Sequence, residues 1–466
     1  MNLRRPARAA LVPWLVGIGI AAVHLTLACV RYANFETPSW DLGIFTQVVN
    51  NYAHFRAPIA PIHGPGFNVL GDHFSPALAL LAPLLWIWQS PVMLLVAQAA
   101  AFGCSAVPIT RLARERLGAP GGLALGIAYG LSAALLQATL VDFHEVALAV
   151  PLLAYALVAL VEERWHAVAY WSLPLLLVKE DLGFTVAALG LLVALRGAQR
   201  IGALLAVAGV VGSFLAVFAI IPILAPGHRY AYFSQYDGAH TRDNLGAVWG
   251  ALAPSRWTAG FSTKLHTVAA LGWSTAFAGG GSSIALVAMP TLAWRFVSAQ
   301  SLYWGTSWHY DAVLMPILFV AAIETCERLV RTDGYLRWLG TTVPAAMLAI
   351  SVTLASSGAI ASLFDDGTWA TTPTQSAEAA ALQIIPSDAV VLTDLGLISH
   401  LAARDDVYWI GTSGDVVPDY IATVDGAGWT PPSPDSAVSY WEARYSGHQF
   451  RLLSYASGVS VLQRVR

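Results

Sequence analysis

Long apolar runs with few charges constrain what this chain can fold into. The run Leu11–Val30 opens a series of apolar segments that continues to about residue 356. A helix that crosses a bilayer needs about 20 predominantly apolar residues, and several of these segments reach that length. Hydrophobic residues make up 56% of the 466 residues and charged residues 11%, which argues against a soluble globule. We therefore predict a polytopic α-helical membrane protein.

The basic start of the chain predicts its orientation. Arg4, Arg5 and Arg8 precede the first apolar run, so the positive-inside rule places the amino terminus in the cytoplasm. Because Leu11–Val30 is long for a signal peptide, we interpret it as a retained first helix. The segment 31–91 is then the first outer loop.

Whether the apolar stretch Ala77–Trp88 crosses the membrane determines the direction of every later helix. It is short and contains Pro83, so we predict that it lies flat at the outer surface rather than spanning. If it spanned, Arg111, Arg114 and Arg116 would fall outside, against the positive-inside rule.

Counting on from this point gives about eleven transmembrane helices. They are Leu11–Val30, Val92–Leu112, Gly121–Leu140, Val146–Val161, Ala167–Val178, Leu182–Leu195, Ile201–Leu224, Leu265–Ala278, Ser283–Val297, Ala312–Cys326 and Leu339–Ser356. The predicted inner turns are rich in arginine, as this orientation requires. A multi-pass membrane location with a cytoplasmic amino terminus follows.

After residue 356 the composition becomes that of a soluble domain. Residues 1–356 form the predicted transmembrane domain, and 357–466 a small extracytoplasmic α/β domain after a linker at Ser362–Ala377. Expected strands are Ala389–Asp394, Val407–Ile410 and Tyr420–Val424, with a helix at Leu395–Ala403 and a hairpin at Phe450–Val465. This domain could be a structural cap or take part in substrate binding.

Ionisable residues gather at the predicted outer ends of the helices. Such groups are costly at membrane depth unless paired or hydrated, so their default interpretation is functional. If the helices form a bundle, these residues could converge on one outward-facing cavity. They are Glu36, Asp41, Asp72, His73, Asp142, His144, Glu145, Lys179, Glu180, Asp181, His228, Arg229, His309 and Asp311.

Each group also has a structural interpretation. Asp41 could cap a helix that begins near Leu42. Asp72 and His73 could belong to a turn with Gly71. The run Lys179–Asp181 could be an ion cluster that neutralises itself. Asp142, His144 and Glu145 could form a structural polar network, and His309 could be a satisfied hydrogen-bond partner.

Cofactor and partner signals are weak. Asp142, His144 and Glu145 are spaced like metal ligands but lack a partner motif, so a divalent cation stays open. We see no nucleotide-binding glycine motif, and a net charge of −3 without a basic tract gives no support for nucleic-acid binding. Cys29, Cys104 and Cys326 lie in apolar segments and indicate neither a disulfide framework nor a thiolate metal site.

Several ordered motifs carry a family resemblance. Asp41-Leu-Gly-Ile-Phe, Gly71-Asp-His-Phe-Ser-Pro, Asp142-Phe-His-Glu, Val178-Lys-Glu-Asp and His309-Tyr-Asp-Ala-Val-Leu-Met-Pro resemble the bacterial membrane family catalogued as domain of unknown function 2079. More distantly, the layout resembles type C glycosyltransferases, whose donor is a polyprenyl-phosphate sugar and which use an acidic residue of the first outer loop. That resemblance implies a catalytic role for Asp41, although no paired acidic motif accompanies it.

The resulting hypothesis is a membrane glycosyltransferase that moves a sugar from a polyprenyl-phosphate donor to an extracytoplasmic glycan or protein. Asp41 would be the base, and Lys179 and Arg229 would contact phosphate. Asp72, His73, His144, Glu180 and His309 would orient sugar or acceptor. Trp40, Phe45 and Trp308 could stack on a sugar or belong to an interfacial aromatic belt. The alternatives are a transporter or flippase and a non-catalytic envelope scaffold.

Overall fold

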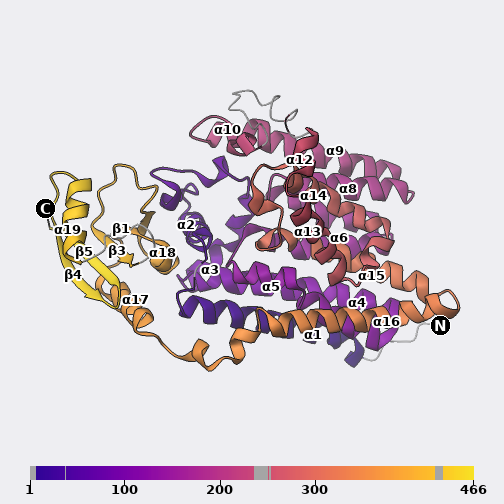
Figure 1. Cartoon of the computed structure of the whole chain (residues 1–466). Coiled ribbons are helices and arrows are strands. Elements are labelled where there is room, and N and C mark those ends of the chain that lie inside the picture. Colours follow the sequence, from indigo (N-terminus) through magenta and orange to yellow (C-terminus); the bar gives the residue numbers. More distant parts are fainter. Residues whose placement is uncertain (1–6, 37, 236–249, 251–252, 426–433, 466) are drawn as a thin grey trace.

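A helical body carries a small sheet domain at one end (Figure 1). The computed structural model describes residues 7–36, 38–235, 250, 253–425 and 434–465. The helices of the body are α1 (Ala7–Ala33), α2 (Asp41–Ala53), α3 (Ala82–Ile87), α4 (Val92–Gly130), α5 (Ala133–Leu140), α6 (Ala149–Val161), α7 (Trp165–Ser172), α8 (Leu182–Leu195), α9 (Gln199–Leu215), α10 (Ile221–Leu224), α12 (Pro254–Thr258), α13 (Phe261–Ser274), α14 (Met289–Val297), α15 (Leu314–Val330) and α16 (Gly334–Ser357).

Within the described residues, four helical stretches are long and apolar enough to cross a membrane. They are Leu11–Ala33, Val92–Leu140, Gln199–Leu224 and Gly334–Ser357. The other predicted spans form shorter or interrupted helices; Ala167–Val178, for example, is α7 followed by a 3₁₀ turn that contains Pro174. The segment Ala77–Trp88 is likewise a 3₁₀ turn leading into the six-residue helix α3. The count of eleven spans stays a prediction.

Gly118 divides α4 into the two helices that the sequence predicts. Its φ of +81° and ψ of 174° lie outside the helical region, in a conformation that favours glycine. Beyond it the chain runs back along itself so closely that a Cβ on Gly126 would collide with Thr110 Oγ1, and one on Gly122 with the backbone of Arg114. The arginine-rich segment 111–116 therefore lies next to a turn, as predicted.

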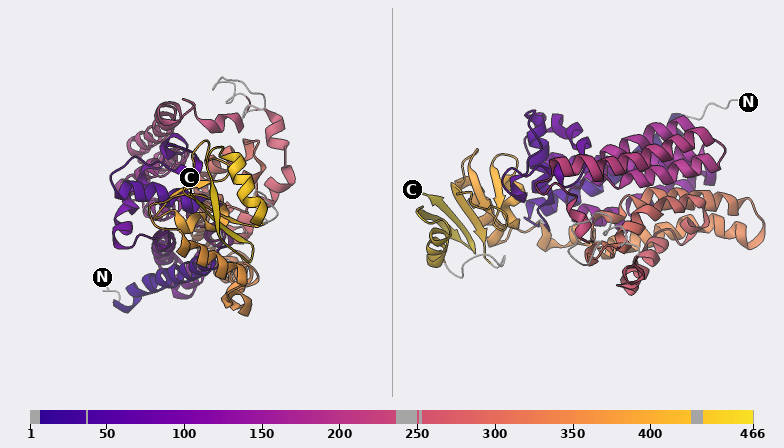
Figure 2. Two further views of the ribbon diagram at one scale, coloured as in Figure 1. Left: turned by 90° about the vertical axis from the view of Figure 1, so that its left-hand side faces the viewer. Right: turned by 90° about the horizontal axis from the view of Figure 1, so that it is seen from above.

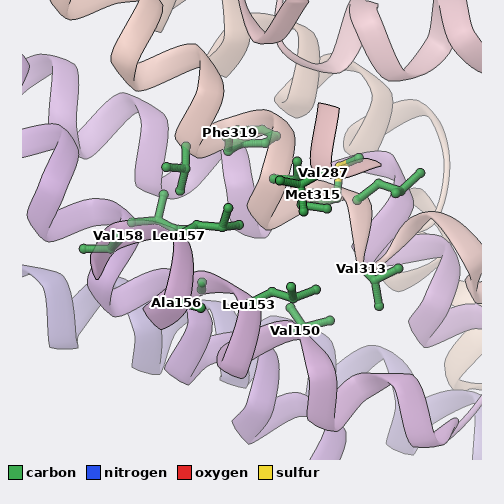
Figure 3. Close-up of a cluster of buried hydrophobic side chains, with 14 of the residues drawn as sticks. Val150, Leu153, Ala156, Leu157, Val158, Val287, Val313, Met315 and Phe319 are labelled. Atoms are coloured by element: carbon green, nitrogen blue, oxygen red, sulfur yellow. The ribbon is translucent and has the colours of Figure 1, made fainter. Parts of the chain in front are cut away.

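The core of the body lies where α6 meets α15. Val150, Leu153 and Leu157 of α6 are fully buried, and Figure 3 shows them beside Met315 and Phe319 of α15. A helix that is apolar on every side is buried in a protein core or surrounded by lipid, and here other helices bury these side chains. α6 and α15 therefore form the centre of the body.

The sheet domain is a mixed five-stranded sheet of order β2-β1-β3-β5-β4. Its strands are β1 (Val390–Thr393), β2 (Asp406–Trp409), β3 (Tyr420–Val424), β4 (Phe450–Ala456) and β5 (Val459–Arg464), and its helices are α17 (Pro373–Ile384), α18 (Leu395–Leu401) and α19 (Pro434–Arg444). β1 pairs in parallel with β2 and β3, whereas β5 pairs antiparallel with β3 and β4. The predicted strands, the short helix and the terminal hairpin are confirmed.

The prediction of a linker over Ser362–Ala377 was wrong for its last part, because α17 begins at Pro373. Thr372 Oγ1 accepts a hydrogen bond from Gln375 N, and the Gln375 side chain accepts one from Thr372 N. This reciprocal arrangement is a capping box, which fixes the start of a helix.

Charged residues divide between the two ends of the elongated molecule. Figure 2 shows the sheet at one end and the amino terminus at the other. Far from the sheet, arginines of the predicted inner turns pair with glutamates of neighbouring helices: Arg111 with Glu162, Arg116 with Glu327 and Arg196 with Glu324. The site candidates lie at the opposite end of the body. The predicted alternation of helix direction agrees with this division, while the side that faces the cytoplasm stays a prediction.

Close packing of α1 on α4 provides a test of the body. A Cβ on Gly17 would lie 2.7 Å from the carbonyl oxygen of Gly103, whereas one on Gly19 of the same helix would meet nothing within 4 Å. Overpacking typically costs about 1–3 kcal/mol. We expect Gly17→Leu to lower the thermal unfolding temperature of the detergent-purified protein and Gly19→Leu to leave it unchanged. Equal melting temperatures would contradict the close contact between α1 and α4.

Candidate functional site

A cavity of about 930 Å³ lies in the helical body near the sheet domain. Eight of the outer-end ionisable residues predicted from the sequence line it, and they come from the first outer loop and three later segments of the chain. They are Asp41, His73, His144, Glu145, Lys179, Glu180, Asp181 and His309. The predicted convergence of outer-end groups is therefore present in the structure.

Asp41 is the first residue of α2 and does not cap it. The residue at the N-cap position is Trp40, and no side chain caps this helix. Ser39 Oγ donates a hydrogen bond of 2.6 Å to Asp41 Oδ2 instead. The same carboxylate oxygen lies 3.3 Å from His144 Nε2. Helix capping therefore does not account for Asp41.

His144 and His309 stack beside Asp41. Their ring centroids are 3.6 Å apart, and both residues are buried. Gln98 holds the turn that carries His144, because its side chain donates to Asp142 O and accepts from His144 N. Although His144 lies at ion-pair distance from Asp41, no imidazole nitrogen of the two histidines has a partner in strict hydrogen-bond geometry among the described residues. The pair therefore keeps hydrogen-bonding capacity for a ligand.

Lys179, Glu180 and Asp181 bind three different partners rather than one another. Lys179 Nζ donates a 2.5 Å hydrogen bond to Glu145 Oε1. The indole of Trp294 donates to Asp181 Oδ2 at 2.9 Å. The direct hydrogen bonds of the three residues therefore go to other segments, while their charges still act on one another within the run.

Glu180 connects the first outer loop with the helices around the cavity. His73 Nδ1 lies 2.7 Å from its Oε1, and Phe74 N donates to its Oε2 at 3.0 Å. Tyr230 donates its hydroxyl to Oε1, and Ser213 of α9 donates to the Glu180 carbonyl. His73 therefore lies in a turn, as its structural interpretation held, and also lines the cavity.

A buried arginine holds the loop that carries His309. Arg295, in the last turn of α14, is fully buried and donates to Tyr303 O, Gly305 O and Asp311 Oδ1. A guanidinium can make these bonds at once because its donors form a rigid fork. The loop it holds brings Tyr303, Trp308, His309 and Tyr310 to the cavity wall.

The pKa values of Asp41 and His73, both in the first outer loop, shift in opposite directions. Burial opposes ionisation of Asp41, but His144, Ser39 and His63 outweigh it and lower its pKa to about 2. Burial and Lys179 disfavour a charged His73, but Glu180 and Asp72 outweigh them and raise its pKa to about 9. At neutral pH Asp41 is a carboxylate and His73 a cation.

Two of the residues predicted to bind substrate, Asp72 and Arg229, do not line the cavity. Arg229 is exposed, just after a turn at His228 with a φ of +50°. Its neighbour Tyr230 contacts Glu180 instead. Asp72 does not line the cavity but contacts a residue that does, because the hydroxyl of Tyr232 donates a hydrogen bond of 3.3 Å to its Oδ2.

Sequence reasoning missed most of the aromatic wall. Trp40, Phe45 and Trp308, which were aromatic candidates from the sequence, do line the cavity. The aromatic residues at 230–233 and 303 lay in segments without apolar periodicity. The missed lining residues include Tyr230, Tyr232, Phe233, Trp294, Tyr303 and Tyr310.

The weak metal candidates point to separate partners. Glu145 forms an ion pair with Lys179, and His144 lies at ion-pair distance from Asp41. Asp142 has a φ of +64°, and its carboxylate does not line the cavity. Across the described parts of the chain, no three His, Cys, Asp or Glu side chains are placed to hold a metal ion.

One side of the cavity is apolar. Small residues of α8 and α14 leave room there, namely Ala187, Ala188 and Ala293. Phe184 and Leu191 of α8 and Phe214 of α9 also line it and are 40%, 60% and 50% exposed. The cavity therefore reaches the outer surface of the helical body between apolar side chains.

Two solved structures share the fold. ArnT from Cupriavidus metallidurans bound to undecaprenyl phosphate superposes with a TM-score of 0.51 at 13% identity, over 96% of this chain and 97% of that chain. The oligosaccharyltransferase of Archaeoglobus fulgidus in complex with Zn and sulfate gives a TM-score of 0.50 at 11% identity, over 88% and 68%. The chain therefore has the fold of type C glycosyltransferases.

No curated protein matches the sequence significantly. The family model described as "Predicted membrane protein (DUF2079)" matches residues 31–437, which include the first outer loop, the whole cavity and most of the sheet domain. The chain thus belongs to the DUF2079 family of predicted membrane proteins.

Proposed function

We propose that this protein transfers a sugar from a polyprenyl-phosphate donor to an extracytoplasmic glycan or protein acceptor. The observation that carries the proposal is a single cavity in which a carboxylate, a lysine and histidines adjoin an apolar opening. A lipid-linked donor needs both environments, because its phosphate and sugar are polar while its prenyl chain is not. The fold shared with an ArnT that binds undecaprenyl phosphate supports this donor class.

The donor's phosphate would bind beside Lys179. A lysine ammonium has three N–H donors, and only one of those of Lys179 is bonded within the described structure, to Glu145. Protonated His73 adds a second positive charge, and the hydroxyls of Tyr303 and Tyr310 add uncharged donors. Donors fixed in advance stabilise the charge of a departing phosphate without reorganisation.

Asp41 would accept the proton of the acceptor hydroxyl. As the acceptor oxygen bonds to the anomeric carbon, the bond from that carbon to the phosphate oxygen breaks and the lipid phosphate leaves. Ser39 and His144 hold the carboxylate, and its low pKa keeps it ionised before each turnover. His144 and His309 are within reach to orient the sugar or the acceptor.

The prenyl chain would leave the cavity between α8, α9 and α14. Phe184, Leu191 and Phe214 expose apolar surface at this opening. In a membrane-embedded helical body this surface faces acyl chains, so the donor could enter from the side without leaving the bilayer.

Removal of the Asp41 charge tests the function directly. General-base catalysis contributes about 10²–10⁴-fold, so Asp41→Asn should lower kcat for transfer from a synthetic polyprenyl-phosphate sugar by about that factor. Asp333, exposed before α16 at the far end of the body, provides the matched control Asp333→Asn. Unchanged kcat in Asp41→Asn would remove Asp41 as the base, and transport of the lipid without a covalent product would overturn the enzyme assignment.

The raised pKa of His73 predicts how stability depends on pH. A folded-state pKa of about 9 against an ordinary value of 6.5 means that the charged histidine stabilises the fold fully below pH 6.5. That contribution is lost as the pH rises to about 9. We expect the wild-type melting temperature to fall more steeply between pH 6.5 and 9 than that of His73→Gln. Parallel curves would contradict the His73–Glu180 ion pair.

A further inference from the structure

The sheet domain packs on the helix that begins with Asp41 but lines none of the cavity. Among the described residues, the cavity wall ends at Tyr310. Yet Leu42, Ile44 and Val48 of α2 share one buried apolar cluster with Ile398 of α18 and Val407 of β2. A cluster shared in this way means that α2 and the sheet domain cannot shift independently without exposing apolar surface.

Gln47 links α2 to the edge of the sheet. It is buried, and its Nε2 donates to Val407 O of β2 at 2.8 Å. Its Oε1 accepts from Ile62 N at 3.2 Å. β2 is an edge strand, whose outward carbonyls need a partner when they are buried. One amide therefore joins the helix of Asp41, the first outer loop and the sheet.

Aromatic contacts hold both ends of the connection between α1 and α2. At the end of α1, the His400 ring stacks between Tyr32 and Phe35, with centroid distances of 4.0 and 4.2 Å. At the start of α2, Trp409 packs edge-on against Trp40 at 4.7 Å. Trp40 lines the cavity and directly precedes Asp41.

We infer that the sheet domain is a positioning element for the site: through Trp409 and Gln47 it sets the placement of Trp40 and Asp41. Trp409 and Gln47 are positioning residues, because neither lines the cavity. A misplacement of about 1 Å at a reacting group can cost about 100-fold in rate. The chemistry would then depend on a domain that never touches the substrate. The inference rests on the proposed transfer reaction only for its kinetic readout.

The groups that hold the donor lie on other elements. Lys179 and Glu180 precede α8, and the apolar opening is formed by α8, α9 and α14. Loss of a contact to α2 should therefore lower turnover while leaving donor binding nearly intact. A general loss of folding would reduce both together.

The test uses the full-length protein with the variants Trp409→Ala, Trp409→Phe and Gln47→Leu. Tyr455→Ala is the matched control, because Tyr455 is a half-exposed aromatic residue on β4, the opposite edge of the same sheet. For Trp409→Ala and Gln47→Leu we expect kcat to fall at least tenfold with KM for the lipid donor within twofold of wild type. Trp409→Phe should recover most of kcat, and Tyr455→Ala should match wild type.

Hydrogen exchange of the α2 amides, residues 41–53, provides a readout independent of activity. Faster exchange in Trp409→Ala and Gln47→Leu, but not in Tyr455→Ala, supports the inference even if the wild type transfers no sugar, an outcome that would overturn the proposed function alone. Unchanged α2 exchange, or kcat retained in both variants of an active enzyme, would overturn the inference.

Discussion

The Glu180 carboxylate holds together the parts of the chain from which the site is built. Its oxygens accept hydrogen bonds from His73 and Phe74 of the first outer loop and from Tyr230 of the segment after α10. Ser213 of α9 donates a further hydrogen bond to the Glu180 backbone carbonyl. A buried carboxylate is tolerated only when its oxygens are paired and hydrogen-bonded. Because these donors all bind Glu180, the first outer loop, α9 and the aromatic segment of Tyr230 are held in place relative to one another. Removal of this one acid would leave a buried histidine cation unpaired and detach the loop that also carries Asp41.

The cavity combines a polar part and an apolar part. Its polar part is internally compensated, since Lys179 is paired with Glu145 and His73 with Glu180. Its apolar part opens at the surface of the helical body, between α8 and α9. This arrangement suits an amphiphilic donor with a charged head and a long apolar chain. It also explains why the ionisable residues are tolerated near the membrane, because each lies beside a partner or beside a space that a polar ligand would fill.

Much of this architecture could be predicted from the chain alone. Apolar runs predicted the helices, arginine-rich turns predicted which helix ends lie together, and alternating patterns predicted β1, β2, β3 and the terminal hairpin. Ionisable residues at the predicted outer helix ends identified Asp41, His144, Lys179 and Glu180, since a charge near membrane depth is costly unless it is paired, hydrated or functional. The sequence could not separate Arg229 from Tyr230, because a single turn at His228 decides which of them faces Glu180. Nor could it find Tyr303 or Trp409, whose roles depend on contacts between segments far apart in sequence.

The central claim is that the cavity holds a polyprenyl-phosphate lipid through its apolar opening. Native mass spectrometry of the protein purified from membranes, followed by identification of the released lipid, tests it most directly. Ala188→Phe would fill the opening on α8, whereas Leu195→Phe places the same phenyl side chain at an exposed position at the end of that helix, away from the opening. We expect a polyprenyl phosphate or its glycosylated form on wild type and Leu195→Phe, and its loss from Ala188→Phe. Equal retention by all three, or only bulk phospholipid on the wild type, would contradict the account.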